Sequence, residues 1–194
     1  MKPERMNAFS DGVMAILITI LVLELQPPEG HALADILDEK GKLLAYLLSF
    51  VMIGIYWNNH HHLMHVVKTI DGRTLWANMH LLFWLSLIPL GTAWLGEAGV
   101  ESGPVAAYAI VLLGCAVAFS ILTMVLLALH EADSKLVQAI GTDRKGKVSL
   151  ACYVVALAAS FVEPWVAIAL FVTVAVIWFL PDRRVERVVD EIET

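Results

Sequence analysis

Charged residues are scarce in this sequence. Of its 194 residues, 16% are Asp, Glu, Lys or Arg and 59% are hydrophobic, and the mean hydropathy is +0.73. Soluble domains carry about 25% charged residues, so this composition excludes a soluble globular protein. It predicts an all-α integral membrane protein that is surrounded by the lipid bilayer. The net charge of −6 gives no indication of nucleic acid binding, and we expect no nucleic acid partner.

Cysteine is also rare, and the N-terminal apolar run lacks the features of a signal peptide. Cys115 and Cys152 are single residues inside apolar runs, where cysteine acts as a small hydrophobic side chain. They predict neither a disulfide nor a metal site, and we expect no cofactor. The first apolar run carries Ser10 and Asp11 near its start and ends in a polar, proline-containing segment at residues 24–28. We therefore expect it to be a membrane helix that is not cleaved.

Long apolar runs, in contrast, fill most of the chain. Runs near the ~20 residues that cross a bilayer fall at residues 6–26, 43–66, 74–96, 104–129, 147–163 and 165–180. The last two are short and meet at Glu163-Pro164. The pattern predicts six transmembrane helices in one domain, residues 1–181, with a short charged cytoplasmic tail at residues 182–194. The loops leave no room for a soluble domain, so we expect the function to lie within the membrane.

Lys and Arg are distributed unevenly over the loops, and this predicts the orientation. The N-terminus, the second and fourth loops and the tail carry Lys2, Arg5, Lys68, Arg73, Lys135, Arg144, Lys145, Lys147, Arg183, Arg184 and Arg187. The other three loops carry only Lys40 and Lys42. Because Lys and Arg accumulate on the cytoplasmic side, we expect both termini to lie in the cytoplasm.

Polar residues within the predicted spans gather at one depth. At ~1.5 Å of rise per residue, Ser10 and Asp11 lie about 6–10 Å from the cytoplasmic end of the first helix. A similar depth is expected for the polar residues of the second and third helices, Asn58, Asn59, His60, His61, His62, Asn78 and His80. Because buried polar groups need partners, this predicts a hydrogen-bonded belt that ties the first three helices together. An alternative, above all for His62 and His65, is that they face the lipid headgroups.

The first helix divides its residues between different sides. At about 100° per residue, a stripe is formed by Gly12, Ile16, Thr19 and Leu23, with Ile20 at its edge. Ser10 and Asp11 point away from the stripe, on opposite flanks. A pore would suit this arrangement, but an apolar stripe alone suits helix packing or lipid contact better.

Three segments resemble one known family. The spelling R-x-x-x-F-S-D at residues 5–11, with the apolar run that follows to residue 25, is similar to the signature helix of potassium channels related to the endolysosomal transmembrane-protein-175 channel. Residues 56–63, Y-W-N-N-H-H-H-L, resemble the Y-W-x-x-H-H pattern of the family's second helix. Residues 76–78 and 85–91 resemble its third helix. Beyond residue 94 the likeness is one of composition only.

The resemblance implies roles for particular residues. In the family, the first helices of the assembly line one central pore. The ion pathway would then be lined by Ile16, Thr19, Ile20 and Leu23, where the branched apolar residues form the constriction and the threonine forms the polar layer linked with potassium preference. A brace at the cytoplasmic side would be formed by the motif residues Arg5, Phe9, Ser10 and Asp11, with His60, His61 and Asn78 as their partners.

The resemblance further implies a homotetrameric potassium channel and not an enzyme. Only one R-x-x-x-F-S-D occurs in the sequence, and one first helix cannot enclose a pore. The prokaryotic form of the family, with four copies about a shared axis in the cell membrane, meets this need, and closed symmetry is usual for homo-oligomers. The sequence has neither a T-V-G-Y-G filter nor an arginine-rich voltage sensor. The resemblance therefore assigns the selection of potassium ions to the Ile and Leu ring and the Thr19 hydroxyls.

Two other interpretations of the polar residues remain open. The histidines at residues 60–65 suggest an intramembrane di-iron enzyme, but such sites need several histidine boxes, and few further histidines lie on this side. A proton-coupled transporter, or a proton leak pathway, would use Asp11 and the histidine cluster as a relay. No inverted repeat supports the transporter. The sequence assigns no role to His62, His65 and His80.

Overall fold

The structure, a computed structural model, describes residues 2–28, 30–130 and 143–179, and the regular secondary structure of these residues is helical. Its elements are α1 (Glu4–Leu23), the 3-10 helix η1 (Leu33–Glu39), α2 (Lys40–His65), α3 (Gly72–Ser86), α4 (Ile88–Ala98), α5 (Ser102–Leu129), α7 (Arg144–Ala159) and α8 (Pro164–Phe179). The all-α architecture expected from composition is confirmed. The predicted tail at residues 182–194 lies outside the described residues, as do Lys135, Arg183, Arg184 and Arg187.

Four segments of the described chain are long and apolar enough to cross a membrane. They are Glu4–Leu23, Ala34–His65, Gly72–Ala98 and Ser102–Leu129. The helices α7 and α8 have 16 residues each. A helix of that length rises about 24 Å, less than the ~30 Å of the hydrocarbon core. The protein is therefore a multi-pass membrane protein, and crossing by α7 and α8 stays a prediction.

The third predicted span, residues 74–96, is not the single continuous helix that we expected. Regular helix is interrupted at Leu87, between α3 and α4. Pro89 has no N–H to donate to the carbonyl four residues earlier, and its ring crowds that carbonyl. The helix resumes at once, because the Gly91 N–H donates to the Leu87 carbonyl at 3.1 Å. The interruption therefore divides one membrane-length segment, Gly72–Ala98, into two pieces.

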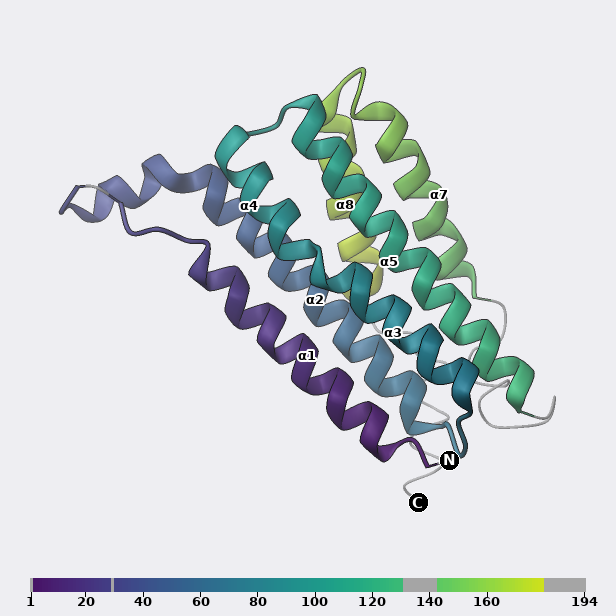
Figure 1. Ribbon diagram of the computed structural model, residues 1–194. Helices are drawn as coiled ribbons and strands as arrows, with labels where there is room; N and C mark the ends of the chain where they lie inside the picture. The colour runs from purple at the N-terminus through teal and green to yellow at the C-terminus, as the bar shows by residue number, and fades with distance from the viewer. Residues whose placement is uncertain (1, 29, 131–142, 180–194) are drawn as a thin grey trace.

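The helices lie side by side in one slanted bundle (Figure 1). In it α1 lies along one edge and packs on α2 and α3, while α7 and α8 pack on each other and on α5. The rings of Tyr108, Phe171 and Tyr153 fill the space between α5, α8 and α7, with centroids 5.5 Å apart for the first pair and 6.3 Å for the second. Because α1 is an edge helix, one of its sides faces the bundle and the other faces outward.

Close packing of α3 on α5 depends on a glycine. Gly114 is buried in α5, and a Cβ atom at this position would overlap the indole ring of Trp84 on α3. The same indole donates its N–H to His80 Nε2, one turn earlier on α3, at 3.0 Å. Small residues allow membrane helices to approach one another closely, so Gly114 makes the room in which Trp84 joins the two helices.

Candidate ion pathway

The helix α1 has one packed face and one open face. Its buried side chains are Met6, Ser10, Met14, Leu17 and Leu21, spaced three or four residues apart. This spacing produces a single stripe along a helix, and the stripe faces α2 and α3. The motif serine therefore lies on the packed face, together with the core.

The four residues expected to line the pathway lie on the open face or at its edge. Ile16 and Leu23 are 58% and 72% exposed. Thr19 is exposed as well, and Ile20 is half-buried. With Gly12, which is also exposed, they form an apolar strip that carries one hydroxyl. This strip is available to another subunit, to lipid or to an aqueous pathway.

The Thr19 hydroxyl is oriented by the backbone. It donates to the Ile16 carbonyl at 2.7 Å. A hydroxyl has one proton and two lone pairs, so with its proton committed, the Thr19 oxygen is left as an acceptor. An acceptor on an apolar strip suits a cation and does not suit an anion.

Ser10 on the packed face belongs to a buried chain of hydrogen bonds that joins three helices. Asn78 of α3 donates its amide N–H to Ser10 Oγ at 2.9 Å, and the Ser10 hydroxyl donates to the Met6 carbonyl at 2.9 Å. Asn78 Oδ1 lies 2.9 Å from His60 Nε2 of α2, so His60 carries its proton on that nitrogen. The three side chains are at most 1% exposed, so Asn78 and His60 depend on this chain for their partners, whereas Ser10 also has the Met6 carbonyl.

Asp11 holds α1 to α2 through a different contact. The Trp57 indole N–H donates to Asp11 Oδ1 at 3.0 Å. His61 stacks on the Trp57 ring, with centroids 5.8 Å apart and an angle of 27° between the planes. His61 therefore lies next to the motif aspartate through Trp57, whereas His60 and Asn78 are connected with the motif serine.

The other two motif residues lie apart from these contacts. Arg5 and Phe9 are exposed, and Phe9 exposes 53% of its surface. Both lie outside the stripe of buried α1 residues that packs on α2 and α3. Within the protomer, the structure does not bring them to His60, His61 or Asn78.

Several polar residues expected in the belt have other surroundings. Asn58 is exposed, and Asn59 donates its amide to the Ile55 carbonyl of its own helix at 2.7 Å. His80 accepts from Trp84 of its own helix. His65, for which the alternative was a position at the lipid headgroups, is exposed at the end of α2 with its ring 6.3 Å from that of His61. Fewer polar residues thus connect α1, α2 and α3 than their common depth predicted.

Two features of the site were missed at the level of sequence. Trp57 is the partner of Asp11, and the available signal was its indole N–H, which needs an acceptor in an apolar medium. A second buried cluster joins α4, α2 and α5: Thr92 Oγ1 lies 2.6 Å from Ser49 Oγ, which lies 2.7 Å from the Tyr108 hydroxyl oxygen. Each of these hydroxyls stands alone in the sequence, so no pattern indicates the cluster.

A strong cap at the start of α3 fixes the position of Asn78. Asp71 Oδ1 accepts hydrogen bonds from the Thr74 backbone N–H and the Thr74 hydroxyl, both at 2.8 Å. These donors stabilise the ionised carboxylate and hold the pKa of Asp71 below its usual range. Since Asn78 follows Thr74 by four residues, the two lie on the same side of α3.

The basic residues of the described chain gather at the end of the bundle where α1 begins, α2 ends and α3 begins (Figure 1). They are Lys2, Arg5, Lys68, Arg73, Arg144, Lys145 and Lys147, whereas Lys40 and Lys42 lie at the opposite end. The contacts of Ser10 and Asp11 lie near the basic end. Within residues 2–28, 30–130 and 143–179, no group of three or more His, Cys, Asp or Glu side chains is placed to hold a metal ion.

Comparisons with known proteins agree with the resemblance in the first three helices and extend it along the chain. The model of the family described as "Endosomal/lysosomal potassium channel TMEM175" matches residues 5–89. A protein named as a potassium channel in a Chryseobacterium species is 48% identical over 187 residues, which cover 96% of this chain and 97% of that protein.

One solved structure and one animal relative are also similar. The crystal structure of a lysosomal potassium-selective channel TMEM175 homolog from Chamaesiphon minutus superposes with a TM-score of 0.79 and 31% identity, over 91% of this chain and 96% of that chain. The "Endosomal/lysosomal proton channel TMEM175" of Danio rerio is 38% identical over 93 residues, which are 41% of this chain and 18% of that protein.

Proposed function

The chain belongs to the TMEM175 family of ion channels, and from this we propose that it is a potassium-permeable, potassium-preferring channel whose pore is lined by α1. The family consists of channels and not of enzymes. One observation carries the proposal. The helix α1 holds Ser10 on its packed face and leaves Ile16, Thr19 and Leu23 on its open face. Such a helix is anchored by one side and offers the other side to a pore.

The pore requires several copies of the chain. One protomer has one α1, which cannot surround an axis, and we propose a homotetramer with four copies of α1 about it. Both termini would lie in the cytoplasm, because the basic end of the described bundle is the end where α1 begins. We assign the assembly to the cell membrane.

The constriction would be formed by rings of Ile16, Ile20 and Leu23, with Thr19 as the polar layer. Branched apolar side chains narrow a pore and resist hydrated ions by excluding water. The Thr19 oxygen, whose proton is committed to the Ile16 carbonyl, would offer four acceptors around the axis. Such a ring assists the partial dehydration of a cation.

The brace would have two parts. Ser10 and Asp11 fix α1 within its own protomer through Asn78, His60 and Trp57, and His61 supports the indole by stacking. Arg5 and Phe9 lie on the open face, where a neighbouring subunit would be their partner. The brace would thus hold α1 both to its own protomer and to the neighbouring subunit of the tetramer.

Single-channel recording of the purified protein in bilayers under bi-ionic potassium and sodium conditions tests the proposal. We expect a cation current whose reversal potential shows potassium preference. A protein that is folded and tetrameric by size but carries no potassium current would contradict it.

A proton pathway is the second candidate function, because the Danio rerio relative is named as a proton channel. The groups available for it are Asp11 and the histidines beside it, of which His61 stacks on the indole bonded to Asp11. Proton flux into liposomes that contain no potassium would favour this function. A flux that needs a cosubstrate gradient would indicate a coupled transporter.

A further inference from the structure

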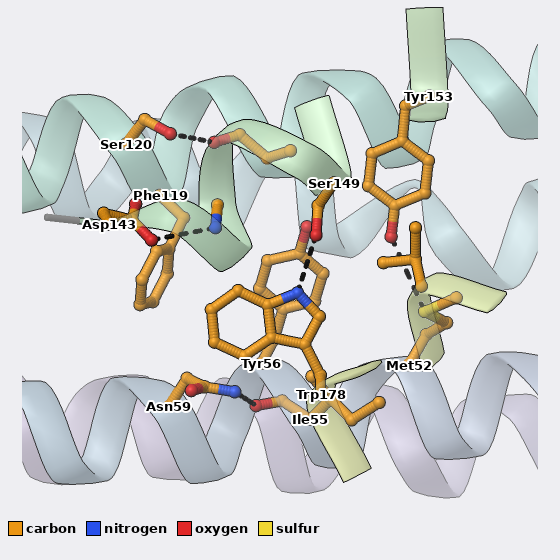
Figure 2. A pocket seen from close by; sticks show the side chains of 13 residues that line it. Met52, Ile55, Tyr56, Asn59, Phe119, Ser120, Asp143, Ser149, Tyr153 and Trp178 are labelled. Carbon is orange, nitrogen blue, oxygen red and sulfur yellow. Dashed lines mark hydrogen bonds between the residues drawn. The ribbon is translucent and has the colours of Figure 1, made fainter. Parts of the chain in front are cut away.

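The helix α2 presents different side chains on its two sides near its C-terminal end. On the inner side, Tyr56 and Asn59 border a small cavity between α2, α5, α7 and α8 (Figure 2). At about 100° per residue, His61 and His65 lie on the opposite side of the helix. Both histidines are exposed. The outer side of α2 thus carries two imidazoles that the packing of the bundle does not cover.

The spacing of His61 and His65 suits two ligands of one metal ion. Residues four positions apart are neighbours on a helix surface, and the two ring centroids are 6.3 Å apart. A zinc ion lies about 2.0–2.1 Å from an imidazole nitrogen, and the ring centroid lies about 1.2 Å behind that nitrogen, so one ion can join rings with centroids up to about 6.5 Å apart. The observed distance is within this limit, and exposed side chains can rotate to bring their nitrogens closer.

The nitrogens of both rings are available to a ligand. Within the residues that the structure describes, His61 and His65 make ring contacts and use no ring nitrogen in a hydrogen bond. The His61 ring is also oriented, because it stacks on Trp57 with centroids 5.8 Å apart and an angle of 27°. Neutral imidazole is the commonest metal ligand in proteins, so the pair offers one positioned ligand and one adjustable ligand.

Charges of the adjoining helix favour a cation at this place. Asp11 of α1 accepts the Trp57 indole N–H. Glu4 precedes Asp11 by seven residues and therefore lies on the same side of α1, at the end of the bundle where α2 ends (Figure 1). Lys68 follows His65 by three residues and opposes these carboxylates. The two carboxylates outnumber this one ammonium group, so the local charge is negative.

We propose that His61 and His65 form a binding site for a divalent late transition-metal ion, such as Zn²⁺, Ni²⁺ or Cu²⁺, with water in its other coordination positions. Imidazole nitrogen suits these ions, whereas Mg²⁺ and Ca²⁺ prefer oxygen ligands. Two protein ligands suffice for such a site, so it agrees with the absence of any three-ligand group among the described residues. The ion links two successive turns at the end of α2, and the site does not depend on α1 lining a pore.

Three metal ions test the proposal. Cu²⁺, Ni²⁺ and Mg²⁺ are titrated calorimetrically into the full chain in lipid nanodiscs, with every polyhistidine tag removed and the signal of empty nanodiscs subtracted. We expect Cu²⁺ to bind more tightly than Ni²⁺, which is the usual order for nitrogen ligands, and Mg²⁺ not to bind. If Cu²⁺ and Ni²⁺ do not bind, the proposal is wrong. Binding of Mg²⁺ as tight as that of Ni²⁺ also overturns it, because it indicates carboxylates or lipid phosphates as the ligands.

Variants identify the two ligands. The second imidazole binds an ion that the first already holds, so we expect His65→Gln to weaken Ni²⁺ binding by about tenfold or more, and His61→Gln to do the same. Ni²⁺ should also raise the unfolding temperature of the wild type and have a smaller effect on His65→Gln. If His65→Gln binds Ni²⁺ as the wild type does, the site is not the one proposed.

His62→Gln is the matched control, because it removes an imidazole from the same turn of α2. The His62 ring meets the His61 ring edge to face, with centroids 5.9 Å apart and an angle of 74°. Adjacent residues of a helix do not face the same side, so we expect His62→Gln to bind Ni²⁺ as the wild type does. A loss in His62→Gln as large as that in His65→Gln would contradict the assignment to His61 and His65.

Discussion

Asn78 of α3 donates a 2.9 Å hydrogen bond to Ser10 of α1 where both side chains are buried, at 1% and 0% exposure. The two residues are 68 positions apart in the sequence. Because Asn78 also bonds His60 of α2, one amide determines how the edge helix is seated on the bundle. Ser10 retains a partner of its own in the Met6 carbonyl, so the amide and the imidazole are the groups that depend on this contact.

Asn78→Leu keeps the approximate shape of the side chain and removes both hydrogen bonds. We expect a loss of about 0.6–2 kcal/mol in the free energy of unfolding, the range found for hydrogen bonds between membrane helices. His60 is left without its partner and Ser10 is not. The loss for Asn78→Leu should therefore be partly relieved in the double variant with His60→Leu, by a coupling energy of about 0.5–3 kcal/mol. Unfolding experiments in detergent measure this coupling energy. If the losses of the two single variants add up to the loss of the double variant, the hydrogen-bond network is contradicted.

Asp11 is expected to be structural and not conductive. Asp11→Ala removes the acceptor of the Trp57 indole, and we expect it to weaken the folded assembly by about 1–3 kcal/mol. Trp57→Phe removes the same hydrogen bond and keeps an aromatic ring for His61, so it should weaken the assembly similarly. Thermal stability and subunit composition are measured together with current. An Asp11→Ala assembly of normal stability that has lost its current would show that the carboxylate acts in conduction.

Thr19 is expected to contribute to selection through its oxygen. Thr19→Val keeps the branched shape and removes the acceptor, so the preference for potassium over sodium should fall while some conduction remains. Thr19→Ser is the matched control, because it keeps a hydroxyl that can donate to the Ile16 carbonyl as Thr19 does. Reversal potentials under bi-ionic conditions measure the effect. An unchanged value for Thr19→Val would exclude this residue from selection.

A substitution at Ile16 tests whether α1 lines a pore or is packed against protein or lipid. In the proposed tetramer, Ile16→Asn places four amides around the axis, and wetting of the constriction should raise the cation current and reduce discrimination between potassium and sodium. On a packed or lipid-facing helix, the same change would bury an amide without a partner at a cost of about 1–3 kcal/mol. It would then reduce expression and leave selectivity unchanged. The current per folded tetramer distinguishes the pore-lining helix from the packed or lipid-facing helix. If substitution of Ile16, Ile20 and Leu23 in each case reduces expression and leaves selectivity unchanged, α1 does not line the pore.

The cap of α3 gives a pH dependence with a definite sign. The pKa of Asp71 is lowered by the Thr74 N–H and hydroxyl, so its contribution to stability is present above the unfolded carboxyl value of about 3.9 and is lost as the pH falls through the lower folded value. Unfolding midpoints of the wild type and of Asp71→Ala should differ at neutral pH and converge in acid. Asp71→Ser, which caps without a titrating group, should show a smaller pH dependence than the wild type. A constant difference between the wild type and Asp71→Ala at every pH would contradict this role.

Much of the fold could be predicted because lipid imposes simple conditions on a sequence. Apolar runs of membrane length indicate the helices, and the equal depth of Ser10, His60 and Asn78 placed them in one layer before their contacts were known. The break at Leu87 could not be predicted with certainty, because membrane helices often tolerate a proline such as Pro89 without a break.

The rest of the site depends on how the helices are rotated. Depth along a helix follows from counting residues, but which side of α2 faces α1 depends on packing, and this selects Trp57 over Asn58 as the partner of Asp11. The same holds for Ser49 and Tyr108, which meet only because α2 and α5 cross at that height. In the proposed assembly the partners of Arg5 and Phe9 belong to a neighbouring subunit, so the fold of one protomer does not contain them.

The back-bond from the Ser10 hydroxyl to the Met6 carbonyl has a consequence for membrane insertion. The helix α1 leaves the ribosome before α2 and α3, and Asn78 is made 68 residues after Ser10. At about 5–20 residues per second, this interval lasts roughly 3–14 seconds. During that time the Ser10 hydroxyl can already donate to the Met6 carbonyl of its own helix. The oxygen of Ser10 then lacks only the hydrogen bond that it later accepts from Asn78. The first helix is thus able to stay in the bilayer until the third arrives to complete the contact.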